Sequence, residues 1–259
     1  MTQAGELQGG LAAILAHPDD ESFGCGGALA LAHDSGATTR LLVATRGEAA
    51  GEAAEGDSDA DEGEADVGDV DDRRAALADI REAELICAAR RLGLDEVSVL
   101  DGYPDGALAD QPFEALVEEI AAWLRSRRPA AVITFGPHGV TGHPDHVAVG
   151  SATRWAVERL ADEGLGPNAV YVISPIFDVA GNRFDLSSEE QSATHRIAVR
   201  EVADRVLAAL ECHASQADAA EQANALRGAI EAGGPIYEAY TRVRPIVPAP
   251  HPKFDTRLL

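Results

Sequence analysis

Short apolar runs alternate with longer stretches of helical periodicity along most of the chain, and this alternation constrains the fold more than any other feature. Residues 11–16, LAAILA, form a continuous apolar run that is typical of a strand buried on both faces. Strands joined by helices form right-handed βαβ units. The sequence therefore predicts an α/β fold, with a single Rossmann-like domain over residues 1–259 and a mostly parallel sheet flanked by helices. Further strands are predicted over 38–45, 96–100, 129–135 and 168–174, and helices over 26–36, 73–93, 113–127, 144–162, 188–212 and 215–231.

Acidic residues concentrate in one segment between the second strand and the next helix. Residues 48–72 contain twelve Asp and Glu and no Lys or Arg, and the whole chain has a formal net charge of −23. Because this segment has no apolar periodicity, we expect a flexible acidic loop inserted in the domain. The charge excludes nonspecific nucleic-acid binding and a polybasic membrane anchor. Such acidity, with Lys253 as the only lysine, favours a salt-adapted, halophilic surface.

Cysteine usage and the first residues bear on the compartment. Cys25, Cys87 and Cys212 are odd in number and form no CxxC pair, so the sequence indicates neither a disulfide framework nor a thiolate zinc site. Residues 1–10 contain no basic segment, and the apolar run that follows is too short for a signal peptide or a membrane span. We expect a cytoplasmic protein without membrane insertion. The sequence leaves the oligomeric state open, and a homo-oligomer could use the acidic loop as a subunit contact.

Histidine and aspartate cluster at two places, each directly after a predicted strand. HPDDE (17–21) follows the first strand, and GHPDH (142–146) follows the fourth across a loop rich in Gly and Pro. One such cluster alone is usually a turn or a helix cap. Two clusters at strand carboxyl ends lie where open α/β sheets bind ligands. Two imidazoles, one carboxylate and an open position make a catalytic zinc set, so the sequence predicts a metal site with groups left over for proton transfer.

With AHPDDESFGCGG (16–27) and GHPDH (142–146), the chain resembles the LmbE-like, or PIG-L, family of zinc-dependent N-acetylglucosaminyl de-N-acetylases. Weaker matches, which include Thr45-Arg46-Gly47-Glu48 and His213-x-Ser215-Gln216, extend the resemblance over roughly residues 11–220. The resemblance implies that His17, Asp20 and His146 bind Zn²⁺, with Fe²⁺ as a possible native metal.

The same resemblance implies roles for further residues. Asp19 is the expected general base, His143 the imidazolium that faces the developing oxyanion, and Asp145 the group that orients His143. Arg81 and Asp105 lie where relatives place substrate contacts, although Arg81 fits a surface ion pair equally well. The position of Thr141, directly before GHPDH, holds a tyrosine in some relatives.

The implied activity is hydrolysis of a linear amide. Attack of zinc-bound water would remove an N-acetyl or N-acyl group from an amino sugar or an N-acetylglucosamine conjugate, a small-molecule substrate whose identity the sequence leaves open. A non-heme iron oxygenase is one alternative, because two histidines and a carboxylate also define its metal site. Oxygenases of that class are mostly β-rich, whereas this pattern alternates strands and helices. A non-catalytic metal- or ligand-binding relative is the second alternative, although such a protein would be expected to lack Asp19 or His143.

Overall fold

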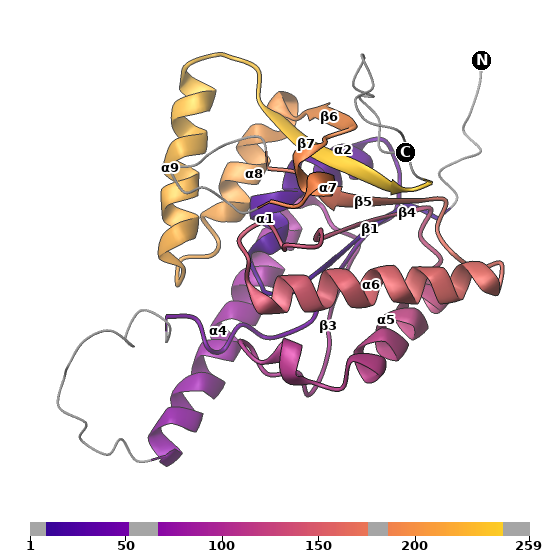
Figure 1. Cartoon of the computed structure of the whole chain (residues 1–259). Helices are drawn as coiled ribbons and strands as arrows, with labels where there is room; N and C mark the ends of the chain where they lie inside the picture. The colour runs from indigo at the N-terminus through magenta and orange to yellow at the C-terminus, as the bar shows by residue number, and fades with distance from the viewer. Residues whose placement is uncertain (1–8, 52–66, 176–185, 246–259) are drawn as a thin grey trace.

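The computed structural model describes residues 9–51, 67–175 and 186–245, which form a seven-stranded sheet with helices on both faces (Figure 1). The strand order is β3-β2-β1-β4-β5-β7-β6. The strands are β1 (Leu11–Leu15), β2 (Thr39–Val43), β3 (Glu96–Val99), β4 (Ala131–Thr134), β5 (Ala169–Ile173), β6 (His195–Ala198) and β7 (Tyr237–Arg244). The helices are α1 (Asp20–Gly24), α2 (Gly26–Asp34), α4 (Val67–Leu92), α5 (Phe113–Arg127), α6 (Pro144–Asp162), α7 (Ser188–Gln191), α8 (Ala203–Leu210) and α9 (Ala217–Glu231), with 3₁₀ turns η1 (Leu108–Asp110) and η2 (Arg200–Val202).

The first five strands are parallel, which confirms the predicted α/β class with a mostly parallel sheet. Strand β1 pairs with β2 on one side and with β4 on the other. The chain therefore winds outward from β1 through β2 and β3 and then returns to β4. A ligand site in an open sheet of this kind forms where the winding direction reverses, at the carboxyl ends of β1 and β4.

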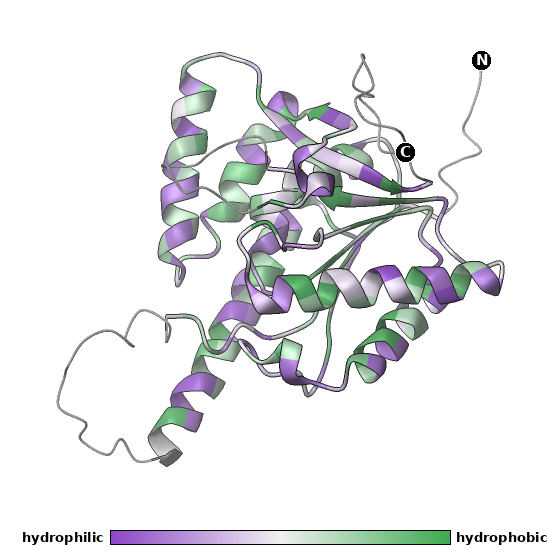
Figure 2. Cartoon of the chain, in the orientation of Figure 1, coloured by the Kyte–Doolittle hydropathy of each residue, from purple (hydrophilic) through white to green (hydrophobic). Residues whose placement is uncertain are grey.

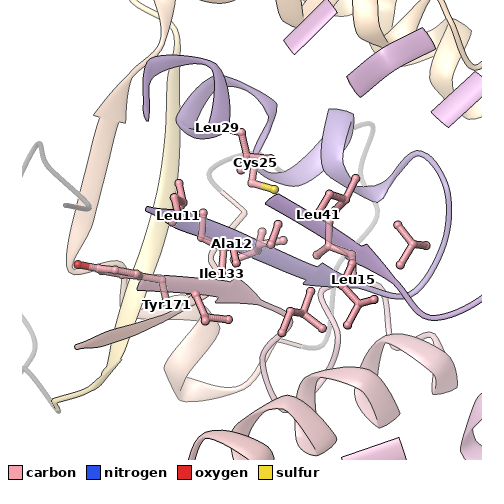
Figure 3. Packing of buried hydrophobic residues seen from close by; sticks show 14 of the residues in the cluster. Leu11, Ala12, Leu15, Cys25, Leu29, Leu41, Ile133 and Tyr171 are labelled. Carbon is pink, nitrogen blue, oxygen red and sulfur yellow. The ribbon is translucent and has the colours of Figure 1, made fainter. Parts of the chain in front are cut away.

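Two helical layers bury the sheet. Helices α5 and α6 pack against each other on one face, and α2, α4 and α8 pack together on the other (Figure 1). Strand β1 is apolar along its whole length and completely buried, and the central strands appear as hydrophobic segments in Figure 2. Leu29 of α2 and Cys25, the residue before α2, pack in one cluster with Leu41 of β2, Ile133 of β4 and Tyr171 of β5 (Figure 3). Burying a leucine side chain contributes about 1.5–3 kcal/mol, so this cluster stabilises the sheet.

The predicted helix over 188–212 is wrong. This stretch instead contains the short helix α7, the edge strand β6, the turn η2 and the helix α8. Strand β6 exists because it pairs antiparallel with β7, a strand that the sequence analysis also missed. The four residues of β6 are too few to show the alternation of apolar and polar side chains by which a strand is recognised. Pairing with the distant strand β7 therefore determines their conformation. The helix predicted over 26–36 is preceded by a separate short helix, α1, and ends at Asp34.

The acidic segment is only partly a loop. Helix α4 begins at Val67, so residues 67–72 of the predicted acidic loop are helical, and residues 52–66 lie outside the described part of the chain. The prediction of a loop is therefore wrong for residues 67–72.

Cys87 and Cys212 form a disulfide, so the expectation of no disulfide is wrong. The two cysteines lie 125 residues apart in the sequence, and only the packing of α4 against α8 brings their Cα atoms to 5.8 Å. The cysteine count therefore no longer supports the expected cytoplasmic location. Cys25 is free and fully buried. Within the ranges that the structure describes, no helix combines the length and apolarity that a membrane span requires.

Candidate metal and catalytic site

The two histidine–aspartate clusters lie together at the reversal point of the sheet. His17 comes two residues after the last residue of β1, and Asp20 is the first residue of α1. His143 is the N-cap of α6, with Pro144 at the first helical position, where a missing N–H costs nothing. Because β1 and β4 are neighbours, HPDDE and GHPDH meet at one edge of the sheet.

Three side chains bring donor atoms into a small triangle. His17 Nδ1 lies 3.2 Å from His146 Nε2, while Asp20 approaches the two rings with different oxygens, Oδ2 at 3.8 Å from His17 Nδ1 and Oδ1 at 3.3 Å from His146 Nε2. One nitrogen of His143 also lies within 4.8 Å of a nitrogen of each of the other two histidines. Ligands held 2.0–2.2 Å from a tetrahedral ion are separated from one another by roughly 3.3–3.6 Å. With the Asp20 carboxylate turned so that one oxygen faces both rings, His17, Asp20 and His146 would hold a four-coordinate zinc ion with one position open.

The far sides of both histidine rings are also occupied. His17 Nε2 lies 3.0 Å from Asp105 Oδ1 and 3.3 Å from Asp145 Oδ2, while His146 Nδ1 lies 2.9 Å from the Gly139 carbonyl oxygen. A histidine that binds a metal usually donates its other N–H to a carboxylate or carbonyl, which fixes its tautomer. Both rings have this arrangement.

The carboxylates also shift the ionisation of the cluster. Burial disfavours charge on His17, but hydrogen bonds to Asp105 and Asp145 and the charge of Asp20 outweigh it and raise the pKa to about 10. Burial likewise opposes ionisation of Asp20, yet the nearby His146 and His17 hold its pKa below the usual range. The surroundings therefore strongly favour positive charge at this point, and a metal cation would replace the bound proton there.

Asp19 lies beside this triangle in a backbone conformation that L-residues rarely adopt, with φ 125°. Arg81 holds it there, because Nη2 donates to Asp19 Oδ2 at 2.8 Å and to the Pro18 carbonyl, while Nη1 donates to the Gly47 carbonyl at 2.8 Å. Arg81 is only 3% exposed, so the structure rules out the surface ion pair that the sequence left open. Burial and the charge of Asp20 raise the pKa of Asp19 to about 7, against the opposing effect of Arg81.

The surroundings of Gly47 explain why the motif TRGE (45–48) has a glycine at its third position. Its φ is +73°, and a Cβ built there would lie 2.3 Å from the Arg81 guanidinium. Asp105, the other predicted substrate contact, faces His17 and lies 3.9 Å from Arg81 Nη1. Its Oδ2 accepts the Ala49 N–H at 2.9 Å, and Glu48 accepts the Asp105 N–H at 2.9 Å. The TRGE loop therefore holds Arg81 and Asp105 at the site.

Asp145 and His143 are arranged differently from the expectation. The Asp145 carboxylate is fully buried, accepts the N–H groups of Gly106 and Leu108, and faces His17. The His143 ring instead accepts the Asp145 backbone N–H at Nδ1, at 3.2 Å. Burial and the charges of His17 and His146 lower the pKa of His143, so a neutral ring with its proton on Nε2 is favoured over the expected imidazolium.

Two site residues, Glu21 and His213, were quoted within motifs but given no role by the sequence analysis. Both side chains are fully buried, and His213 Nε2 lies 2.8 Å from Glu21 Oε1. The other Glu21 oxygen accepts the N–H of Asp19 at 3.1 Å. The motif His213-x-Ser215-Gln216 was the one sign in the sequence that His213 could belong to the site. Its partner Glu21 is identified only by the contact in the folded structure.

A cavity of about 1190 Å³ opens beside the cluster. His17, Asp19, Asp20, Arg81, Asp105 and His146 line one part of it, whereas His143 is absent from that lining. The rest of the lining is mostly apolar and comes from α1, α8, α9 and the start of β7. The His143 ring remains close, with centroids 4.7 Å from His17 and 5.0 Å from His146.

Comparison with known proteins identifies the family of the chain. The family model described as PIG-L, GlcNAc-PI de-N-acetylase, matches residues 12–157. A 1D-myo-inositol 2-acetamido-2-deoxy-alpha-D-glucopyranoside deacetylase of Corynebacterium urealyticum is 32% identical over 175 residues, which cover 58% of this chain and 48% of that protein. The chain thus spans about half the length of that relative. A probable N-acetyl-alpha-D-glucosaminyl L-malate deacetylase 2 of Bacillus cereus is 28% identical, covering 80% of this chain and 83% of its own.

Solved structures extend the likeness to the whole fold. The crystal structure of the conserved protein TT1542 from Thermus thermophilus matches with a TM-score of 0.64 and 24% identity, over 94% of this chain and 98% of its own. The 4-carboxy-2-hydroxymuconate hydratase GalB from Pseudomonas putida matches with the same TM-score and 21% identity, over 93% of this chain and 99% of its own. A hydratase shares the fold, so the reaction has to be argued from the site residues.

Proposed function

Because the chain belongs to the PIG-L family of de-N-acetylases, we propose that it is a metal-dependent amide hydrolase that removes the N-acetyl group from an amino-sugar conjugate. The observation that carries this proposal is the donor triangle of His17, Asp20 and His146, with the Asp19 carboxylate beside it in the same cavity. Metal-assisted hydrolysis requires these two parts, an open metal position and an adjacent base.

The metal and the chain divide the chemistry between them. Zinc bound to the triangle would polarise the amide carbonyl and lower the pKa of a coordinated water toward ~7. Asp19 accepts the proton of the attacking water and then delivers it to the departing amine. Its pKa near 7 suits both steps, because a base and an acid of this kind work best near the operating pH. Arg81 keeps the Asp19 carboxylate aimed at the cavity.

His143 is assigned to the oxyanion. Its Nδ1 accepts a backbone N–H, so Nε2 carries the proton and acts as a neutral donor. The ring is not part of the cavity lining but lies beside two residues that are, with centroids 4.7 Å from His17 and 5.0 Å from His146. One such donor contributes about 2.7–4 kcal/mol of transition-state stabilisation in other hydrolases. Asp145 and Asp105 act through His17 by holding its ring with Nδ1 toward the metal.

The cavity favours a conjugate over a free monosaccharide as the substrate. Pockets for drug-sized ligands measure roughly 300–1,000 Å³, and the volume here is about 1190 Å³. The two relatives named above are a deacetylase of an inositol glycoside and a probable deacetylase of a malate glycoside. We therefore assign to the cavity an N-acetylglucosamine joined to a second group, which would pack against the apolar lining.

Release of primary amine tests the proposal. The protein, stripped with a chelator and reconstituted with Zn²⁺ or Fe²⁺, is incubated with N-acetylglucosamine and with N-acetylglucosaminides that carry inositol, malate or a second sugar. Amine should appear only with metal present, at least ~10-fold faster from one of the conjugates than from the monosaccharide. Absence of amine and acetate from every substrate, in a protein that binds metal stoichiometrically, would contradict the proposed deacetylation.

A further inference from the structure

We infer that Glu190, on the short helix α7, is a positioning residue for the metal site and acts on His146 through the loop 136–142. This inference rests on the proposed metal site. It concerns a residue outside the segment matched by the family model, in a helix that lies beside β5 and β7 (Figure 1).

The loop has an unusual backbone. Gly139 and Val140 both have positive φ, at +64° and +65°. A β-branched residue in the left-handed region is a genuine outlier, and such strain persists only where the surroundings over-determine the conformation. Gly139 cannot be replaced easily, because a Cβ at that position would lie 2.6 Å from His146 Cβ.

Glu190 holds this strained loop. Its side chain is 1% exposed, and it accepts the Val140 N–H at Oε1 at 3.0 Å and the His138 N–H at Oε2 at 3.3 Å. Oε2 also accepts the backbone N–H and the hydroxyl of Ser187, as the third residue of a capping box. A capping box needs only the bond from the Ser187 N–H to the Glu190 carboxylate and the reciprocal bond from the Glu190 N–H to Ser187 Oγ. The two bonds to residues 50 and 52 positions away are additional.

The loop 136–142 places one carbonyl oxygen, that of Gly139, beside the metal site. The amides of His138 and Val140 flank Gly139, whose carbonyl oxygen lies 2.9 Å from His146 Nδ1. The same carbonyl accepts the Thr141 N–H at 2.7 Å, so its direction is tied to the turn. A proton on His146 Nδ1 leaves Nε2 free to bind metal. Glu190 thereby fixes both the orientation and the tautomer of this ligand from a distance.

Measuring zinc affinity distinguishes a positioning role of Glu190 from a role only in stabilising helix α7. In E190Q the amide nitrogen cannot accept, so at least one N–H of the loop loses its partner. We expect the zinc dissociation constant, measured by competition with a chromophoric chelator, to rise about 10–100-fold, as it does when other groups behind metal ligands are removed. The matched control is E189Q, which breaks the partly exposed Arg154–Glu189 ion pair on the same helix and should leave zinc affinity within twofold.

A second variant tests the route through the loop. Glycine adopts positive φ without strain, so V140G should restore most of the zinc affinity of E190Q in the double variant. In the zinc-loaded protein, ¹⁵N spectra should show a His146 Nδ1–H that is protected from solvent exchange in the wild type and exchanges faster in E190Q. If E190Q does not fold, E190D retains the charge with a shorter reach and is expected to show the same loss.

The outcomes distinguish the two proposals. A wild-type protein that binds neither Zn²⁺ nor Fe²⁺ contradicts the proposed function. A wild-type protein that binds zinc, with E190Q or E190D equally tight but less stable, shows that Glu190 is a helix cap only and overturns this inference alone. If V140G recovers none of the zinc affinity lost in E190Q, Glu190 does not act on His146 through Gly139, and the inference is also overturned.

Discussion

His213 Nε2 lies 2.8 Å from Glu21 Oε1, and both side chains are fully buried although 192 residues separate them in the sequence. Glu21 is the last residue of HPDDE and accepts the N–H of Asp19. This contact connects the loop between α8 and α9 to the turn that carries Asp19 and Asp20, the proposed base and metal ligand. Among buried side-chain atoms of the described residues, His213 Nδ1 is one that has no hydrogen-bond partner.

The first prediction concerns this pair. H213Q and E21Q should each lower the free energy of unfolding by about 3–5 kcal/mol, because each leaves a buried charged partner uncompensated. The double variant should lose less than the sum, with a coupling of about 0.5–3 kcal/mol in urea titrations. His33 and Asp95, partly exposed and 3.8 Å apart, form the control pair and should show a coupling below ~1 kcal/mol. Additive losses at Glu21 and His213 would argue against the ion pair.

The second prediction separates the base from the ligands. D19N keeps the shape of Asp19 but cannot accept a proton, so it should bind metal normally and lose ~10²–10⁴-fold in kcat. Metal content by elemental analysis and amine release measure the two effects independently. Near-normal turnover with full metal content would assign proton transfer to another group.

The third prediction concerns the ligand set. H146A removes one corner of the donor triangle and should lose the metal on dialysis, while unfolding remains cooperative. H138A provides a control from the same loop, since His138 contacts Glu190 through its backbone N–H, which the substitution retains. Full metal stoichiometry in H146A would contradict the assigned site.

The fourth prediction concerns Arg81. Its two terminal nitrogens reach Gly47 on one side and Pro18 and Asp19 on the other, a fork that a single ammonium cannot reproduce. R81K should therefore lower kcat by about 10–100-fold, with metal content retained. R46K is the control: Arg46 is 40% exposed in ion pairs with Asp79 and Glu82, and its replacement should change kcat less than twofold. Equal losses in the two variants would mean that Arg81 is not a specific support of Asp19.

The fifth prediction concerns salt. The chain carries a net charge of −23, and raising ionic strength from ~0.1 to ~1 M shortens the Debye length from about 10 Å to about 3 Å. Repulsion between neighbouring carboxylates is then screened, so the melting temperature should rise across a KCl series. The same series in tetramethylammonium chloride controls for effects specific to potassium. A flat profile in both salts would rule out the proposed salt-adapted surface.

Local pattern predicted the central part of the fold. Strands such as β1 are buried on both faces by helices, so they appear in the sequence as continuous apolar runs. The positions of HPDDE and GHPDH after two such strands were enough to expect a shared site, because strand ends of a parallel sheet lie at one edge. The edge strand β6 could not be anticipated, since its pairing with β7 determines it.

The α/β alternation, the two histidine–aspartate clusters and the residue types available for binding a cation could all be predicted from the chain. Which atoms face one another depends on the packing: the Asp145 carboxylate contacts His17 instead of His143, Cys87 bonds to Cys212, and Glu190 accepts the Val140 N–H. This difference follows from the range over which each interaction acts. Burial and backbone periodicity leave a signal in neighbouring residues, whereas hydrogen bonds and ion pairs act over about 3 Å between groups that can be separated by any length of chain.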